Sequence, residues 1–141
     1  MGKILVISFS DKEEETVFHD IMGLLEQHEF QSYEKLDYQP VVTFGSYVLE
    51  PQELSVKKDG KPLDFSYREF SLLYLLASNK GIVFKYHYLY ETLWGEHYLH
   101  ETTSSITALV SHVRAKIEPD SRHFQYILTV RGIGYRFNPA Y

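Results

Sequence analysis

From residue 41 onward, apolar and polar residues follow several different spacings, and each spacing predicts a different kind of element. Within residues 42–44, 47–49 and 54–56 the apolar residues recur at every second position, which predicts a small antiparallel sheet. The string Lys58-Asp59-Gly60-Lys61 supplies a hairpin turn. Spacings of three and four then predict three helices, and two short apolar runs near the C-terminus predict a final hairpin.

The predicted helices have recognisable starts and ends. The first opens at a capping box formed by Ser66 and Glu69 and ends at Asn79-Lys80-Gly81. The second is shorter. The third begins in the hydroxyl-rich run 102–105, which can cap it, and Pro119 bars its continuation. The buried face of the third helix is expected to consist of Ile106, Val110, Val113 and Ile117.

The final hairpin carries one arginine, Arg131, at its tip. Its strands are expected to bury Tyr126, Leu128 and Val130 on one side of the turn and Tyr135 and Phe137 on the other. Gly132 and Gly134 are expected to supply the positive φ angles of a tight or bulged turn. An arginine held in this way suits the narrow groove of a DNA duplex. Taken alone, the hairpin is equally consistent with a solvated arginine.

Residues 1–40 follow a different pattern. An apolar run at residues 4–7 predicts a short buried strand, and Ser10 with Glu13 has the spacing of a capping box. The helix that follows has an apolar stripe made of Val17, Ile21, Leu24, Leu25 and His28. Residues 33–40 are expected to form a linker. The predicted domains are therefore residues 1–40 and residues 41–141.

Length and charge constrain the function classes. A chain of 141 residues with 44% apolar content fits one domain of about 100 residues and an appendage. Residues 1–40 carry three bases against nine acids, a net charge of −6, whereas residues 41–141 carry 11 bases against 10 acids, a net of +1. Nucleic-acid binding would therefore depend on local charge placement. The absence of cysteine excludes disulfides, and no apolar run reaches membrane-spanning length, so an intracellular protein is expected.

The order of sheet, three helices and arginine-tipped hairpin is that of a winged helix-turn-helix, an α+β fold. Specific residue strings carry a closer resemblance: Ser66-x-x-Glu69-Phe70, Leu93-Trp94-Gly95, Val113-Arg114-x-Lys116-Ile117-Glu118 and Thr129-Val130-Arg131-Gly132-Ile133-Gly134-Tyr135. Together, over residues 43–138, they resemble the DNA-binding domain of the OmpR/PhoB family of bacterial response regulators. The resemblance implies a transcription regulator of the bacterial cytoplasm that binds double-stranded DNA.

The resemblance also implies contact residues. In the family the third helix lies in the major groove, and the matching positions here are Ser111 and His112 for an arginine pair and Arg114 for the arginine after it. Thr129 matches a wing phosphate contact and Arg131 the arginine of the minor groove. The arginine pair itself is absent from this chain. Helix geometry independently places Ser104, Ala108, Ser111 and Ala115 opposite the buried stripe, with Thr107 on one flank. The predicted DNA contacts are Arg131, Thr129, Arg114, His112, Ser111, Ser104, Thr107 and Lys116.

Residues 1–40 resemble the first strand and helix of a receiver domain, and the match stops there. Ser8 and Phe9 stand where the receiver has an acid pair, and no phosphoacceptor segment is recognised before the sheet. DNA binding is therefore expected to be independent of phosphorylation. A lone strand-helix unit cannot cover its own apolar face. It is expected to dock on the winged domain or to form a homodimer, and the homodimer is favoured.

The remaining chemistry is sparse. His97, His100 and Glu101 lie close in sequence, but their spacing matches no metal-site motif, and no catalytic or cofactor-binding motif is recognised. No enzyme activity, metal or cofactor is expected. The sequence supports a sequence-specific DNA-binding transcription regulator. The alternative is a winged-helix protein-interaction module that meets RNA polymerase, another regulator or its own copy.

Overall fold

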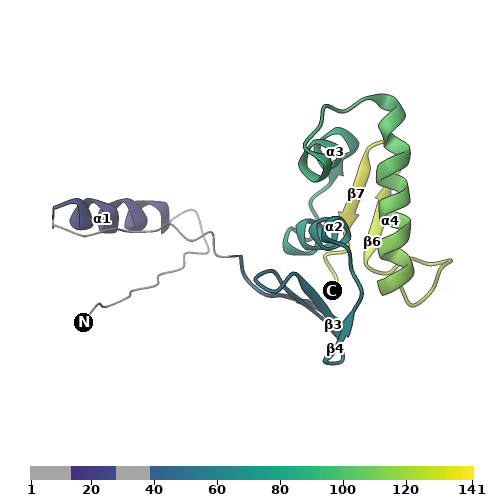
Figure 1. Cartoon of the computed structure of the whole chain (residues 1–141), viewed down its shortest axis with the longest axis horizontal. Coiled ribbons are helices and arrows are strands. Elements are labelled where there is room, and N and C mark those ends of the chain that lie inside the picture. The colour runs from purple at the N-terminus through teal and green to yellow at the C-terminus, as the bar shows by residue number, and fades with distance from the viewer. Residues whose placement is uncertain (1–13, 28–38) are drawn as a thin grey trace. The chain divides into compact units, whose positions relative to one another are not determined.

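The computed structural model describes residues 14–27 and 39–141 and divides the chain into two units, Met1–Tyr38 and Gln39–Tyr141 (Figure 1). In the first unit, α1 spans Glu14–Glu26, which confirms the predicted helix. Val17 and Leu24 on its apolar stripe are 49% and 59% exposed. The predicted strand at residues 3–8, the capping box and His28 lie outside the described residues.

The second unit begins with a four-stranded antiparallel sheet. Its strands are β1 (Val42–Phe44), β2 (Tyr47–Glu50), β3 (Ser55–Lys58) and β4 (Lys61–Leu63), paired in that order. Asp59 and Gly60 both have positive φ, 51° and 77°, which is the conformation of a tight hairpin turn. The sequence predicted three of these strands. It missed β4 because Lys61-Pro62-Leu63 has little apolar character, and Pro62 is accommodated because β4 is an edge strand.

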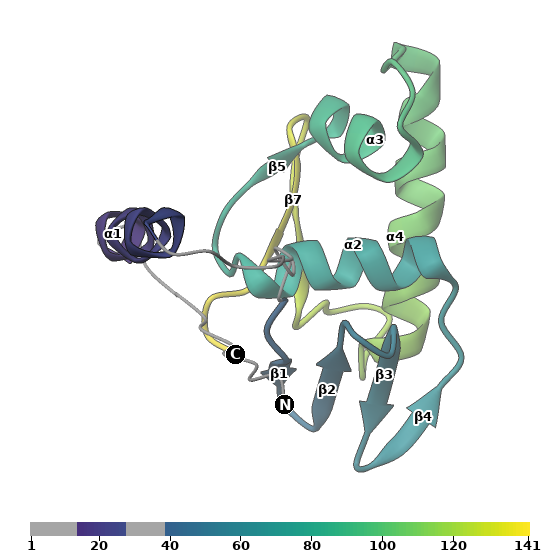
Figure 2. The same ribbon diagram turned by 60° about the vertical axis from the view of Figure 1, so that its left-hand side comes forward.

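Three helices follow and pack against one another, and the first of them also packs against this sheet (Figure 2). They are α2 (Tyr67–Ser78), α3 (Tyr86–Trp94) and α4 (Thr103–Ile117), and a short 3₁₀ turn, η1 (His100–Thr102), precedes α4. The capping box is confirmed, since the Glu69 N–H donates to Ser66 Oγ and the Ser66 N–H to Glu69 Oε2. The predicted inner face of α4 is confirmed, because Ile106, Val110, Val113 and Ile117 are at most 2% exposed.

The C-terminal hairpin belongs to a second sheet, which lies beside α4 (Figure 1). Its strands are β5 (Phe84–Lys85), β7 (Gly134–Phe137) and β6 (Ile127–Val130), in the order β5-β7-β6. Of the positions predicted to be buried on this strand, Tyr126 is buried and Leu128 and Val130 are half-buried, while Ile127, which was not predicted, is fully buried opposite Phe137. Thr129, which has the same phase as Ile127, is exposed, so no regular alternation of burial describes β6.

The two glycines of the hairpin have different roles. Gly132 has a φ of 76° and forms the turn as predicted. Gly134 does not have a positive φ, which corrects the prediction. A Cβ on Gly134 would instead lie 1.9 Å from the carbonyl oxygen of Phe84. Glycine is therefore required there by the close approach of β5 to β7.

Candidate nucleic-acid interface

The outward face of α4 is exposed and carries small or neutral side chains: Ser104, Thr107, Ala108, Ser111, His112 and Ala115. Two of its hydroxyls donate to backbone carbonyls three residues earlier, Ser104 Oγ to Glu101 O of η1 at 3.2 Å and Thr107 Oγ1 to Ser104 O at 3.0 Å. Their oxygen lone pairs are therefore left to accept hydrogen bonds from outside. Of the predicted contact residues, these two together with Ser111 and His112 lie on one exposed surface.

Arg114 does not lie on this surface as a free cation. Its Nη2 donates to Ile127 O at 2.7 Å and to Thr129 Oγ1 at 2.9 Å, and its guanidinium lies 3.8 Å from the centre of the Phe124 ring. Burial lowers the pKa of Arg114, although an arginine remains charged at neutral pH. Arg114 therefore connects α4 to β6.

Thr129 is exposed on β6, and its bond with Arg114 fixes how its hydroxyl can act. Because Thr129 Oγ1 accepts from the guanidinium, the hydroxyl proton is left to donate to an acceptor outside the protein. A phosphate oxygen is such an acceptor. The geometry therefore suits the phosphate contact that the sequence predicted for Thr129.

Glu118 follows the last residue of α4 and holds the start of β6. Its carboxylate accepts from the backbone N–H groups of Gln125 at 2.7 Å, Tyr126 at 2.9 Å and Ile127 at 2.8 Å. Sequence reasoning included Glu118 in a motif but gave it no role. An acid at a helix C-terminus is electrostatically unfavourable unless hydrogen-bond donors surround it. The position of Glu118 in the sequence was therefore a signal that its carboxylate has partners elsewhere in the fold.

Lys116 is also engaged within the protein. Its Nζ donates to Asp64 O at 2.6 Å and forms an ion pair with Glu69, the acid of the capping box. Burial raises the pKa of Glu69, but the hydrogen bonds from Lys116 and the Ser66 N–H lower it more, so the net pKa lies below the ordinary value. Lys116 therefore ties α4 to the start of α2.

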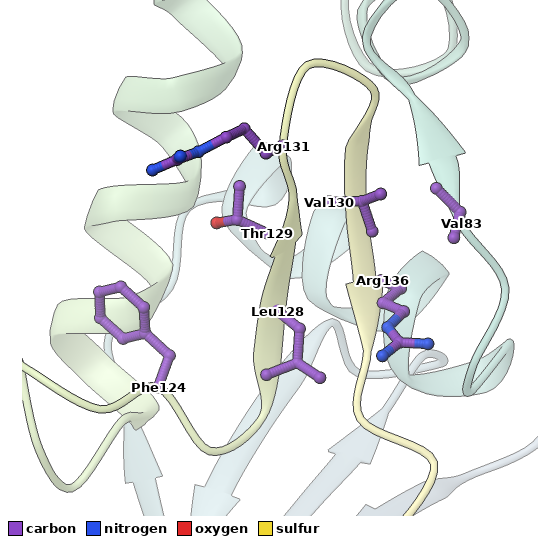
Figure 3. A pocket seen from close by; sticks show the side chains of 7 residues that line it. All are labelled: Val83, Phe124, Leu128, Thr129, Val130, Arg131 and Arg136. Atoms are coloured by element: carbon purple, nitrogen blue, oxygen red, sulfur yellow. The ribbon is translucent and has the colours of Figure 1, made fainter.

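Arg131 is exposed at the tip of the β6–β7 hairpin, between strand β6 and Gly132. The turn is closed by a hydrogen bond from the Ile133 N–H to Val130 O at 3.0 Å, and Ile133 O accepts from the Tyr86 N–H at 3.2 Å. Arg131 and Thr129 point to the side of the hairpin on which α4 lies (Figure 3). The wing cation therefore lies on the side of the hairpin that faces α4.

A shallow, open depression lies beside the wing. Its lining residues are Val83, Phe124, Leu128, Thr129, Val130, Arg131 and Arg136 (Figure 3). It is mostly apolar, with two arginines at its edge. Within residues 14–27 and 39–141 no group of three or more histidines and acids is placed to bind a metal. His97, one of the histidines considered above, has its Nδ1 3.5 Å from Glu91 Oε1. In the same part of the chain, no helix is long and apolar enough to cross a membrane.

Comparison with known proteins supports the fold. Residues 60–137 match the family described as "Transcriptional regulatory protein, C terminal". The DNA-binding domain of CpxR from E. coli is 28% identical, with 73% of this chain and 100% of that chain covered and a TM-score of 0.66. The DNA-binding domain of RstA from Klebsiella pneumoniae, solved in complex with RstA box, is 28% identical, with coverages of 72% and 99% and a TM-score of 0.65.

A longer protein is also similar. DrrB from Thermotoga maritima, described as an OmpR/PhoB homolog, is 25% identical, with a TM-score of 0.62. The match covers 88% of this chain but 52% of DrrB, so this chain spans about half the length of that relative. These comparisons confirm the predicted winged helix-turn-helix fold.

Proposed function

Since this chain belongs to the OmpR/PhoB-type family of transcriptional regulatory proteins, whose C-terminal DNA-binding domain it matches, we propose that it is a sequence-specific regulator. It binds double-stranded DNA in the bacterial cytoplasm, with α4 in the major groove and the β6–β7 wing at the minor groove. The observation that carries the proposal is the exposed Arg131 on the α4 side of the wing.

The contact residues divide between the two elements. Arg131 enters the minor groove, Thr129 donates to a phosphate, and the major groove is contacted by Ser104, Thr107, Ser111 and His112. Arg114 and Lys116, expected at the interface from the sequence, act instead as positioning residues because their charged groups are bound within the protein. Arg114 sets the distance between helix and wing.

Selection of bound sequences from a random duplex library tests this function. The full chain is expected to enrich a discrete motif. Its binding to a labelled duplex that contains this motif is then measured by fluorescence anisotropy. We expect log K against log salt to have a slope of only about −3, because few free cations are available to reach phosphates. Failure to enrich any motif would contradict sequence-specific binding.

We propose further that DNA binding is independent of phosphorylation. Ser8 and Phe9 occupy the positions where the family's receiver has its acid pair. Addition of acetyl phosphate and Mg²⁺ to the full chain is expected to leave both its mass and its affinity for the selected duplex unchanged. A phosphorylated species with altered affinity would refute this part of the proposal.

The chain is also proposed to act as a homodimer through its N-terminal unit. The exposed Val17 and Leu24 of α1 offer apolar surface to a second copy, and pairing would raise the effective concentration of two weak DNA-binding modules. Light scattering of the full chain is expected to show a dimer, and Leu24→Glu to shift it to monomer, with Glu26→Gln as control. A wild-type monomer at tens of micromolar would exclude the dimer.

A protein-interaction module is the second candidate function. It is favoured by the mostly apolar depression beside the wing, where Leu128 and Val130 are half-exposed. RNA polymerase is the proposed partner in this case. In this case purified RNA polymerase binds the full chain and does not bind the Leu128→Asp variant. If the duplex selection also enriches no motif, these results favour this function over DNA recognition.

A further inference from the structure

We propose that this protein reads A·T base pairs in both grooves: small side chains of α4 contact thymine methyl groups and adenine edges in the major groove, and Arg131 occupies the narrow minor groove of the same A·T-rich site. The proposal rests on the proposed DNA-binding function and names the class of operator.

The first step is that α4 has no free cation for guanine. Arg114 and Lys116 are the only arginine or lysine residues of α4, and both are bound within the protein. Arg114 Nε is buried as well, so the guanidinium cannot present its two-donor edge to a base. Bidentate arginine or lysine contacts to guanine O6 and N7 are the commonest specific major-groove contacts. They are excluded for α4 in this conformation.

The second step concerns what α4 does present. The methyl groups of Ala108 and Ala115 are exposed, and an apolar contact of this kind distinguishes thymine, the base that carries a C5-methyl group. Ser104 and Thr107 donate to backbone carbonyls and therefore offer acceptors outward, which suit the N6 amino group of adenine. Cytosine also has an amino donor, so the methyl contact is what selects the A·T pair.

The third step comes from the wing, which is an independent element. Arg131 is exposed, and a Cβ on the adjacent Gly132 would have nothing within 4 Å, so the tip is slender and unobstructed. Arginines enter narrow minor grooves, which A·T tracts provide together with an enhanced negative potential. The amino group of guanine projects into that groove. Helix and wing therefore favour the same base pairs.

The electrostatics of the whole chain agree with this assignment. The net charge is −5, and both basic residues of α4 are bound within the protein. Affinity from phosphate neutralisation is accordingly small. A narrow A·T groove concentrates negative potential where the tip of the wing presents Arg131, which makes Arg131 more effective there than in a wide groove.

Four short duplexes of equal length separate the two readouts, each used as competitor against the selected labelled duplex. They contain only A·T, A·U, inosine·C or G·C pairs. A·U pairs lack the thymine methyl, whereas inosine·C pairs have the major groove of G·C but no minor-groove amino group. We expect A·T to compete best. Each lost methyl contact weakens competition about fourfold, so A·U is weaker by about fifteenfold for two contacts.

Variants assign each preference to its element. Arg131→Ala is expected to make inosine·C and G·C compete equally while A·T remains better than A·U. Ala108→Ser with Ala115→Ser is expected to remove the difference between A·T and A·U while inosine·C remains better than G·C. Lys61→Ala, which changes an exposed lysine on the edge strand β4, serves as the charge control and should retain both preferences.

The outcomes are distinguishable. A wild-type protein that binds its selected duplex but is competed equally by all four duplexes, or best by G·C, overturns the A·T assignment and leaves DNA binding intact. A protein that enriches no duplex at all overturns the proposed function together with the assignment. Loss of both preferences in Lys61→Ala would refute the assignment of either preference to α4 or the wing.

Discussion

Helix α4 and the wing, the two elements proposed to meet DNA, differ in where they keep positive charge. On α4, Arg114 and Lys116 are bound to backbone carbonyls and to Glu69, so the exposed face is neutral. On the wing, Arg131 is exposed and points to the side of the hairpin on which α4 lies. The difference shows that a basic residue of a DNA-binding motif can stabilise the fold through internal hydrogen bonds. Candidate DNA contacts must therefore be chosen from the basic residues whose charged groups have no partner within the protein.

The largest effect is expected from Glu118→Ala. Three backbone N–H groups at the start of β6 would lose their acceptor, and we expect the free energy of unfolding to fall by about 3 kcal/mol. Urea denaturation measures it, with the exposed Glu101→Ala as control. Equal stability of the two variants would mean that Glu118 does not hold the wing to α4.

Arg131→Ala tests the wing side of the comparison. We expect DNA binding to weaken by about 1–3 kcal/mol in anisotropy titrations, because the minor-groove cation is lost. The free energy of unfolding should stay within about 0.5 kcal/mol of wild type, since the side chain is exposed. An unchanged affinity in this folded variant would remove the wing from the interface.

Glu69→Gln tests the α4 side. It weakens the capping box and the ion pair with Lys116, and we expect a loss of about 1–2 kcal/mol in stability at neutral pH. Because the folded pKa of Glu69 lies below its ordinary value of 4.5, this stability is present above that value and is lost as the pH falls through the folded pKa.

Urea denaturation of wild type and Glu69→Gln at a series of pH values checks the direction of the Glu69 pKa shift. The difference between them should be full at neutral pH and should shrink under acidic conditions. A difference that grows toward low pH would contradict the lowered pKa. A marked gain in DNA affinity for Glu69→Gln would show that Lys116 reaches phosphate once released. The exposed face of α4 would then not be neutral in the complex with DNA.

The smallest effect is expected from Ser111→Arg combined with His112→Arg, which places free cations on the neutral face. We expect affinity at low salt to rise by about 1 kcal/mol and the salt slope to steepen by about 2. Gln39→Arg with Gln52→Arg, two exposed positions outside α4 and the wing, adds the same charge as a control. Weaker binding by the Ser111 and His112 variant would mean that another face docks on DNA.

The sequence alone determined the order of elements, the inner face of α4, the capping box of α2 and the family. These features are local: the spacing of Ile106, Val110 and Val113 and the hydroxyl of Ser66 act within one or two helical turns. Residue strings in the right order then identified the winged helix-turn-helix before any long-range contact was known.

Only the tertiary structure decided which residues of those strings face outward. Strand β5 exists because Phe84 and Lys85 pair with Tyr135 and Gly134 about 50 residues later, so no local pattern announces it. Arg114 and Lys116 look free in the sequence, but their partners, Ile127 and Asp64, lie 13 and 52 residues away. Electrostatic and hydrogen-bonding partners are chosen by proximity in space, which periodicity along the chain does not encode.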